Sequence, residues 1–220
     1  MIKKIKDFLK KHYPKPEYSI TVLIALTLFL LLMPFSFENT RQANLISKWN
    51  EKINRIKYMF SVIEAHTTDD MLKSLKKAQT TKEKEKILLM IIKPYLRINI
   101  EKNPIKRYRP KFLNGAKINK SSRYYFEDFY YAENNSIVGI KNVYTETERD
   151  PLFLMMFDIN GMLLPNRWGK DIFGINIYDD GQIQPFGYDM DMQSLKNDCS
   201  KRGTGVGCSY YYVIGGDFDD

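Results

Sequence analysis

Histidine and cysteine are almost absent from this chain of 220 residues, which contains two of each. The motifs H-E-x-x-H, G-x-S-x-G and the P-loop do not occur, so common signatures of metalloproteases, serine hydrolases and nucleotide-binding enzymes are missing. A histidine-based triad would have to use His66, because His12 lies in a lysine-rich N-terminal segment. These absences favour a protein that is not an enzyme.

Basic residues are scarce in the last third of the chain. The formal net charge is +8, yet from Pro151 onward ten aspartates outnumber five basic residues. Lysines instead crowd the N-terminus, at Lys3, Lys4, Lys6, Lys10, Lys11 and Lys15. A basic N-terminal part and an acidic C-terminal part indicate a protein oriented across a membrane rather than one with a basic face for nucleic acid.

Charged residues are also absent from residues 18–37, YSITVLIALTLFLLLMPFSF. About 20 apolar residues in a helix can cross a bilayer's hydrocarbon core, so this segment predicts a transmembrane helix. The alternative is a cleaved signal peptide, but the run exceeds the roughly 7–15 apolar residues of such peptides and no A-x-A-like site follows. The basic residues of segment 1–17 then predict a cytoplasmic leader, with everything after Phe37 outside the cytoplasm.

The two cysteines, Cys199 and Cys208, lie close together near the C-terminus. In an oxidising compartment such a pair closes a small disulfide loop. The alternative is a metal site, but the chain has no C-x-x-C motif and both histidines are far away in sequence. The sequence therefore predicts a disulfide.

Residues 38–100 predict an extracytoplasmic helical region. Its first helix continues the membrane segment and carries apolar residues at steps close to three and four: Leu45, Ile46, Trp49, Ile53, Ile56, Phe60 and Ile63. A helix over about 69–79 and another ending near Pro94 follow. Residues 101–122 combine many bases with two prolines and one glycine, which predicts a basic loop. Outside the cytoplasm we expect no nucleic acid partner for this loop.

The apolar pattern changes to that of strands over residues 123–220. A hairpin is expected around Glu133–Asn135, then a buried strand in PLFLMMF, and then a second hairpin turning at Asp179–Gly181. In that hairpin Phe173, Ile175 and Ile177 alternate toward the core, and YYYVIGGD predicts a last short strand. The sequence thus predicts an α+β fold in which the long helix packs on a small antiparallel sheet.

The motifs of the second hairpin resemble those of bacterial prepilin-type proteins. D-x-N-G is followed by P-N, by G-x-D-x-F and by D-G-x-I-x-P, and the cysteine pair comes after them. These motifs resemble those of type IV pilins and type II secretion pseudopilins over roughly residues 158–214. The N-terminal part of the chain, a membrane helix that extends outward toward a small sheet, resembles these proteins in layout only. The resemblance implies a non-enzymatic pilus or pseudopilus subunit or accessory in the bacterial inner membrane. Its implied partners are membrane lipid and like subunits, contacted through the N-terminal helix.

The leader departs from that family's pattern. In the family a glycine is cleaved by prepilin peptidase, and a glutamate and a proline follow in the helix; Glu17 and Pro34 have that spacing, which implies assembly roles for them. On this register His12 occupies the glycine position, and Pro14 and Pro16 stand where the family has apolar residues. A second hypothesis therefore stays open: a stand-alone membrane-anchored binding domain with a pilin-like C-terminal module.

Asp158 and Asn160 open a D-I-N-G stretch that resembles the start of a calcium loop. An EF-hand needs glycine in sixth place and glutamate in twelfth, whereas here the glycine is fourth and Gly169 is twelfth. Capping of a turn by the two side chains is the simpler interpretation. Some pseudopilins bind calcium near their C-terminal loops, and this resemblance adds further calcium ligands to test: Asp189, Asp191, Asp217 and Asp219. We expect no other cofactor.

Overall fold

The computed structural model describes residues 16–66, 78, 80–99, 105, 107–143, 150–178 and 181–217. Outside these ranges lie residues 1–15 of the predicted leader, nearly all of the helix predicted over 69–79, the turn residues Asp179 and Asp180, and Asp219. The chain divides into two compact units, Met1–Ala43 and Asn44–Asp220, and each is described by itself.

The first unit consists, in its described part, of the beginning of helix α2, which spans Pro16–His66. Every side chain from Ile20 to Leu31 is exposed, and most of these side chains are large and apolar. Glu17 and Pro34 fall within α2, but their side chains lie outside the described part. Among the described residues, no helix combines the length and the apolar character needed to cross a membrane.

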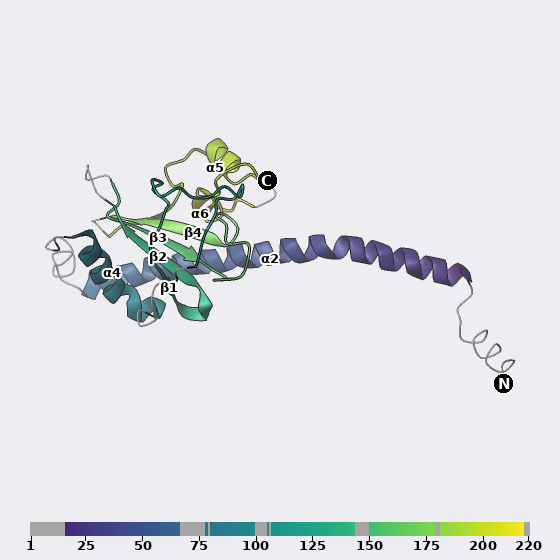
Figure 1. Cartoon of the computed structure of the whole chain (residues 1–220), viewed down its shortest axis with the longest axis horizontal. Coiled ribbons are helices and arrows are strands. Elements are labelled where there is room, and N and C mark those ends of the chain that lie inside the picture. The colour runs from purple at the N-terminus through teal and green to yellow at the C-terminus, as the bar shows by residue number, and fades with distance from the viewer. Residues whose placement is uncertain are drawn as a thin grey trace, which may run out of the picture. The chain divides into compact units, whose positions relative to one another are not determined.

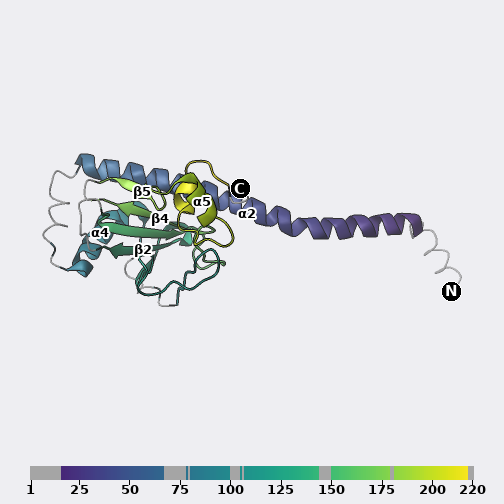
Figure 2. The same cartoon turned by 90° about the horizontal axis from the view of Figure 1, so that it is seen from above.

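The second unit is built on a five-stranded antiparallel sheet, with neighbouring strands in the order β1-β2-β3-β4-β5 (Figures 1 and 2). The strands are β1 Phe129–Tyr131, β2 Ile137–Asn142, β3 Phe153–Asp158, β4 Ile172–Ile177 and β5 Ile183–Pro185. The short 3-10 helix η1, Glu133–Asn135, joins β1 to β2 at the predicted turn. The α+β class and the antiparallel sheet are thus confirmed.

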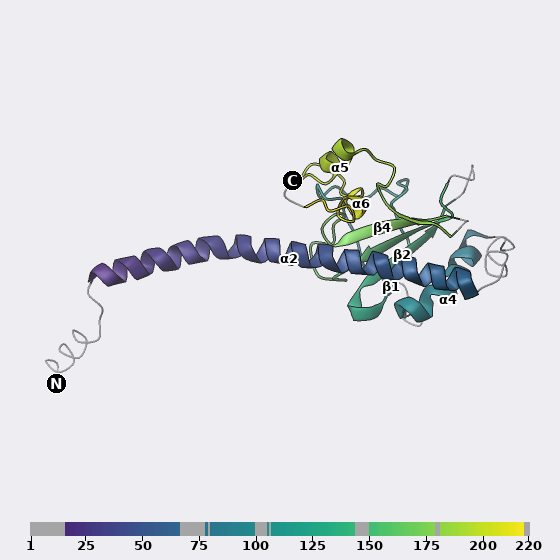
Figure 3. The ribbon, with the colours of Figure 1, turned by 180° about the vertical axis from the view of Figure 1, so that it is seen from behind.

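One face of the sheet is covered by α2 and by helix α4, Thr81–Leu96 (Figure 3). The predicted apolar stripe of α2 is buried there, from Leu45 to Ile63, and the half-buried Ile46 packs at its edge. The sheet contributes alternate residues to this core, including Phe157, Phe173 and Ile175. Because side chains alternate along a strand, the register of β3 and β4 brings these residues to one face.

The opposite face of the sheet is covered by the segment that leads from Tyr108 to Phe126. Both of these aromatic residues are buried in a second core with Leu154 and Met156 of β3 and with Trp168. A sheet buried on both faces explains why PLFLMMF is apolar throughout rather than alternating. Residues 107–122, which read as a loop from their bases, therefore also supply part of the core.

The C-terminal region contains helices instead of the predicted last strand. After β5 come α5, Met192–Asp198, and α6, Cys208–Tyr211, so the prediction of a strand over YYYVIGGD is wrong. The Tyr212 N–H donates to the Cys208 carbonyl oxygen at 3.1 Å, which is a helical bond. Tyr211 and Tyr212 are both buried in the core that α2 covers. A helical turn allows these two adjacent side chains to face the same core, whereas a strand would point them to opposite sides.

Candidate functional site

The predicted disulfide is confirmed. Cys199 follows the end of α5 and Cys208 begins α6, and the bond joins two buried residues nine positions apart. The carboxylate of Asp198, the residue before the loop, accepts hydrogen bonds from two backbone N–H groups inside it, those of Thr204 and Gly207, both at 2.8 Å. The disulfide and this carboxylate together fix the loop and the start of α6.

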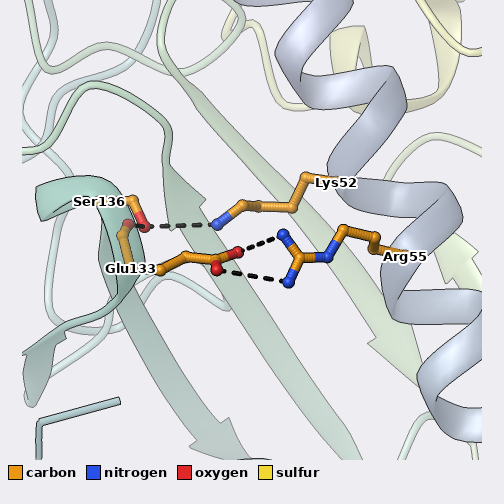
Figure 4. Close-up of polar contacts among 4 residues, drawn as sticks. All are labelled: Lys52, Arg55, Glu133 and Ser136. Carbon is orange, nitrogen blue, oxygen red and sulfur yellow. Dashed lines mark hydrogen bonds and ion pairs between the residues drawn. The ribbon is translucent and has the colours of Figure 1, made fainter. Parts of the chain in front are cut away.

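A polar contact joins α2 to the turn between β1 and β2 (Figure 4). The Arg55 guanidinium donates to both carboxylate oxygens of Glu133, at 2.7 and 3.3 Å. One turn earlier, Lys52 donates to the Ser136 hydroxyl at 3.3 Å, and its Nζ lies 5.8 Å from the centre of the Phe157 ring. Burial lowers the pKa of the Lys52 ammonium, with the nearby Glu133 carboxylate opposing this effect. These contacts orient the hairpin on α2, and nothing in them provides a nucleophile open to a substrate.

Replacing Lys52 by methionine is expected to change how stability depends on pH. A lysine whose folded pKa is lowered destabilises the fold while it is charged, and this penalty disappears as the pH rises through the folded value toward 10.5. Methionine keeps the packed stem without the charge. Relative to the variant, wild type should therefore gain stability over the interval in which the pH rises from the lowered folded pKa of Lys52 to its unfolded value of 10.5. Urea unfolding across that range measures the difference, and Lys48→Met on an exposed site of α2 is the matched control. A difference that stays constant with pH would contradict the expectation.

Asp158, the last residue of β3, is fully buried. Its carboxylate accepts a hydrogen bond from the Tyr108 hydroxyl at 2.5 Å and one from the Asn160 backbone N–H at 3.1 Å. Burial, and next the neighbouring Asp171 carboxylate, raise the pKa of Asp158 to about 8. The bond to Asn160 is the turn cap that the sequence favoured, and Tyr108 adds a contact from fifty residues away.

Asp171 is the second fully buried carboxylate of the same loop. It accepts hydrogen bonds from the backbone N–H of Asn166 at 2.9 Å and of Arg167 at 2.7 Å. Burial raises its pKa, and these two backbone bonds oppose the rise. The D-x-N-G, P-N and G-x-D motifs therefore fold into one closed loop between β3 and β4.

Gly161 fits this loop because only glycine suits its position. Its φ is 69°, in the left-handed region that side chains disfavour. A Cβ there would collide with the carbonyl oxygen of Asn135, which belongs to the turn between β1 and β2. The glycine of D-x-N-G thus allows the loop to touch the neighbouring hairpin.

The other predicted calcium ligands do not join Asp158 and Asn160. Asp191 caps α5 by accepting hydrogen bonds from the backbone N–H of Gln193 and Ser194, and Asp189 and Asp217 are exposed. Asp219 lies outside the described residues. In the part of the chain that the structure describes, no three histidine, cysteine, aspartate or glutamate residues gather in a way that could hold a metal. The six predicted residues are thus not one site.

Sequence reasoning did not select Tyr108 or Asp171 as site residues. Asp171 belongs to the G-x-D-x-F motif, which was a usable signal, whereas nothing in the sequence near Tyr108 indicated that its side chain would contact Asp158.

A search with protein-family models, with curated proteins and with solved structures finds nothing that matches the chain.

Proposed function

We propose that the protein is a non-enzymatic, single-pass protein of the bacterial cytoplasmic membrane, with its N-terminus in the cytoplasm and its C-terminal domain outside. It acts as a pilin-like subunit or accessory of a type IV pilus or type II secretion pseudopilus. Assembly occurs through the N-terminal helix, which packs against like helices in the lipid.

The observation that carries this proposal is the double character of α2. From Ile20 to Leu31 its side chains are exposed around the whole helix, and no charge interrupts residues 18–37. A helix that is apolar on all sides suits lipid or a helix bundle better than a one-sided partner. Further along the same helix, apolar residues lie in a single stripe that packs on the sheet of the second unit.

The disulfide supports the placement of the second unit outside the cytoplasm. Disulfides form and persist in oxidising compartments and are rare in the cytosol. The bond between Cys199 and Cys208 is therefore consistent with export of residues 38–220.

A stand-alone membrane-anchored binding domain is the second candidate, favoured by His12 at the position of the cleaved glycine. Both candidate functions require the N-terminal membrane helix, but only the pilin-like subunit requires the leader before Tyr13 to be cleaved. N-terminal sequencing of the membrane-bound protein separates the two functions. A start at Tyr13 supports assembly as a pilin-like subunit, whereas an intact Met1 supports a fixed anchor.

The anchor and the assembly are tested by fractionation and by crosslinking. Wild type should remain in carbonate-washed membranes, and arginine at both Leu26 and Leu28 should release it, since each arginine at the centre of a span costs about 2.5–3.5 kcal/mol. Leu23→Cys and Leu30→Cys should give helix-to-helix crosslinks in cells, because both native cysteines are already bonded. Tyr58→Cys, exposed in the second unit, is the control. Wild type in the soluble fraction would overturn the anchor, and anchored protein without crosslinks would overturn assembly.

A further inference from the structure

Three consecutive apolar side chains are exposed in the loop between β3 and β4. Met162, Leu163 and Leu164 are 45%, 67% and 74% exposed, and we call these three residues the apolar tip. Apolar residues scattered singly over a surface are ordinary, whereas a contiguous exposed group is typical of an interaction site. The apolar tip therefore calls for a partner.

The fold holds the apolar tip from both sides. Before the tip, Gly161 packs so closely on the Asn135 carbonyl oxygen that no side chain would fit between them. After the tip, the fully buried Asp171 carboxylate accepts a hydrogen bond from the Arg167 backbone N–H at 2.7 Å. A loop that is already ordered loses little conformational entropy when it binds.

Basic residues lie directly beside this loop. Lys111 and Arg167 form a parallel bridge, in which the Lys111 backbone N–H donates to the Asn166 carbonyl oxygen at 3.1 Å and its carbonyl oxygen accepts from Trp168 at 3.0 Å. Lys111 also pairs with Lys117 in an antiparallel bridge. We call Lys111, Lys117 and Arg167 the basic row. Like charges opposite one another destabilise a pair, so the basic row favours an anion from outside the fold.

The same segments expose no acidic side chain that could balance the basic row. Residues 102–126 contain no aspartate or glutamate. The one acidic residue of the loop itself, Asp171, is fully buried. A third segment adds further positive charge, since the Asn114 side chain donates to the Arg202 carbonyl oxygen at 3.2 Å, next to the exposed Lys201. The exposed charges of these segments are thus basic.

The loop lies at the end of the second unit where the chain enters it. That unit begins at Asn44, and Trp49, five residues later, stacks on Phe173 with ring centroids 5.0 Å apart and lies 6.2 Å from Phe157. Phe157 and Phe173 stand on the two strands that the loop joins. Asn44 follows the last residue of the apolar run, Phe37, by seven residues, which span at most about 25 Å. The proposed anchor therefore tethers this end of the unit close to lipid.

We propose that the apolar tip inserts into the lipid surface outside the cytoplasm, while the basic row binds the phosphates of phospholipid headgroups. This inference rests on the proposed membrane anchor. Apolar side chains at the headgroup boundary, combined with bases that contact anionic lipid, are typical of interfacial binding. A second copy of this chain is a poorer partner, because two apolar tips that met would bring two basic rows together.

Insertion is tested on the full-length protein in phospholipid vesicles, with a polarity-sensitive fluorophore on one cysteine. Both native cysteines are bonded, so Leu163→Cys, Leu26→Cys and Gln182→Cys each provide a single labelling site. Gln182 is exposed beyond the other end of β4, about 20 Å along the strand from the loop, and is the control. We expect lipids with brominated chains to quench the labels at Leu26 and Leu163 and to leave the label at Gln182 unchanged.

The basic row is tested by Lys111→Gln/Lys117→Gln in vesicles that contain phosphatidylglycerol. Two lysines at an anionic surface should change the ratio of inserted to free loop about thirtyfold. The quenched fraction of the Leu163 label reports this ratio, and quenching of the anchor label should not change. Lys82→Gln/Lys86→Gln, which removes two exposed lysines from α4, is the matched control and should leave both labels unaffected.

A quenched label at Leu26 with an unquenched label at Leu163 would overturn this proposal and leave the membrane anchor standing. A label at Leu163 that reports apolar surroundings but is not quenched by lipid would also overturn it, because protein would then cover the tip. Equal quenching at Leu163 and Gln182 would show general adsorption instead of insertion of the loop. Absence of quenching at both Leu26 and Leu163 would overturn the anchor as well.

Discussion

Trp49→Ala is expected to lower the free energy of unfolding by about 3–5 kcal/mol, the usual cost of truncating a large buried aromatic side chain. Trp49 is fully buried, and its ring stacks on Phe173 with centroids 5.0 Å apart and planes 19° apart. Its Nε1–H donates to the Ser209 carbonyl oxygen at 2.8 Å. Alanine would leave a cavity between α2 and the sheet and would leave that carbonyl without its donor.

Thermal and urea unfolding in mild detergent measure this loss. At roughly 2–4 °C per kcal/mol, the melting temperature should fall by about 10 °C. Tyr58→Ala is the matched control, because it removes a large aromatic ring from the same helix at a site that is 72% exposed. Its cost should stay within about 0.5 kcal/mol. Trp49→Phe keeps a ring and removes the donor, so it should lose about 1–2 kcal/mol. Equal costs for Trp49→Ala and Tyr58→Ala would show that α2 is not held by this contact.

The stripe that contains Trp49 was predictable because it depends on local spacing. Apolar residues at steps of three and four fix one face of a helix wherever that helix packs. The same is true of Phe173, Ile175 and Ile177, whose alternation fixes one face of a strand. The cysteines were predictable for another reason, since only one pairing exists when a chain has two.

The end of the chain was not predictable in this way. A run of Tyr210, Tyr211 and Tyr212 has high strand propensity, yet it forms α6 and the turns that follow. The deciding contacts are distant: Ser209 accepts a hydrogen bond from Gly174 on β4 and the Tyr212 hydroxyl donates to the Gly169 carbonyl oxygen. Propensity is a weak guide where tertiary contacts of this kind settle the backbone.

The loop between β3 and β4, which contains Asp158 and Asp171, was predictable only in part. The motif placed Asp158, Asn160 and Asp171 in one stretch, and the turn cap on Asp158 was predicted from D-x-N-G. The burial of both carboxylates depends on Tyr108 and the segment after it, which cover the second face of the sheet. The sequence of this segment predicted a basic loop and not a cover for the sheet. The burial of Asp158, and with it the raised pKa, could therefore not be foreseen.

Removing the disulfide is expected to cost about 2.5–3 kcal/mol in Cys199→Ala/Cys208→Ala. The cysteines are nine positions apart, and cross-linking a loop of about ten residues removes entropy from the unfolded chain and so raises its free energy by roughly this amount. The fold should survive, because Asp198 still accepts hydrogen bonds from Thr204 and Gly207 within the loop. Circular dichroism should therefore be unchanged at low temperature while the urea midpoint falls.

Reduction of wild type provides the control for the alanine substitutions. Reduced wild type and the double variant should lose similar stability, since both lose the same cross-link. The loss should also couple to Trp49, because α6 begins at Cys208 and presents the Ser209 carbonyl to the indole. Combining the double variant with Trp49→Phe should give a coupling energy of at least about 0.5 kcal/mol, as expected for groups that are linked through one hydrogen-bonded segment. If reduction costs nothing, or if the two losses simply add, then the disulfide does not hold α6 against α2, and the hydrogen bonds of Asp198 are sufficient to do so.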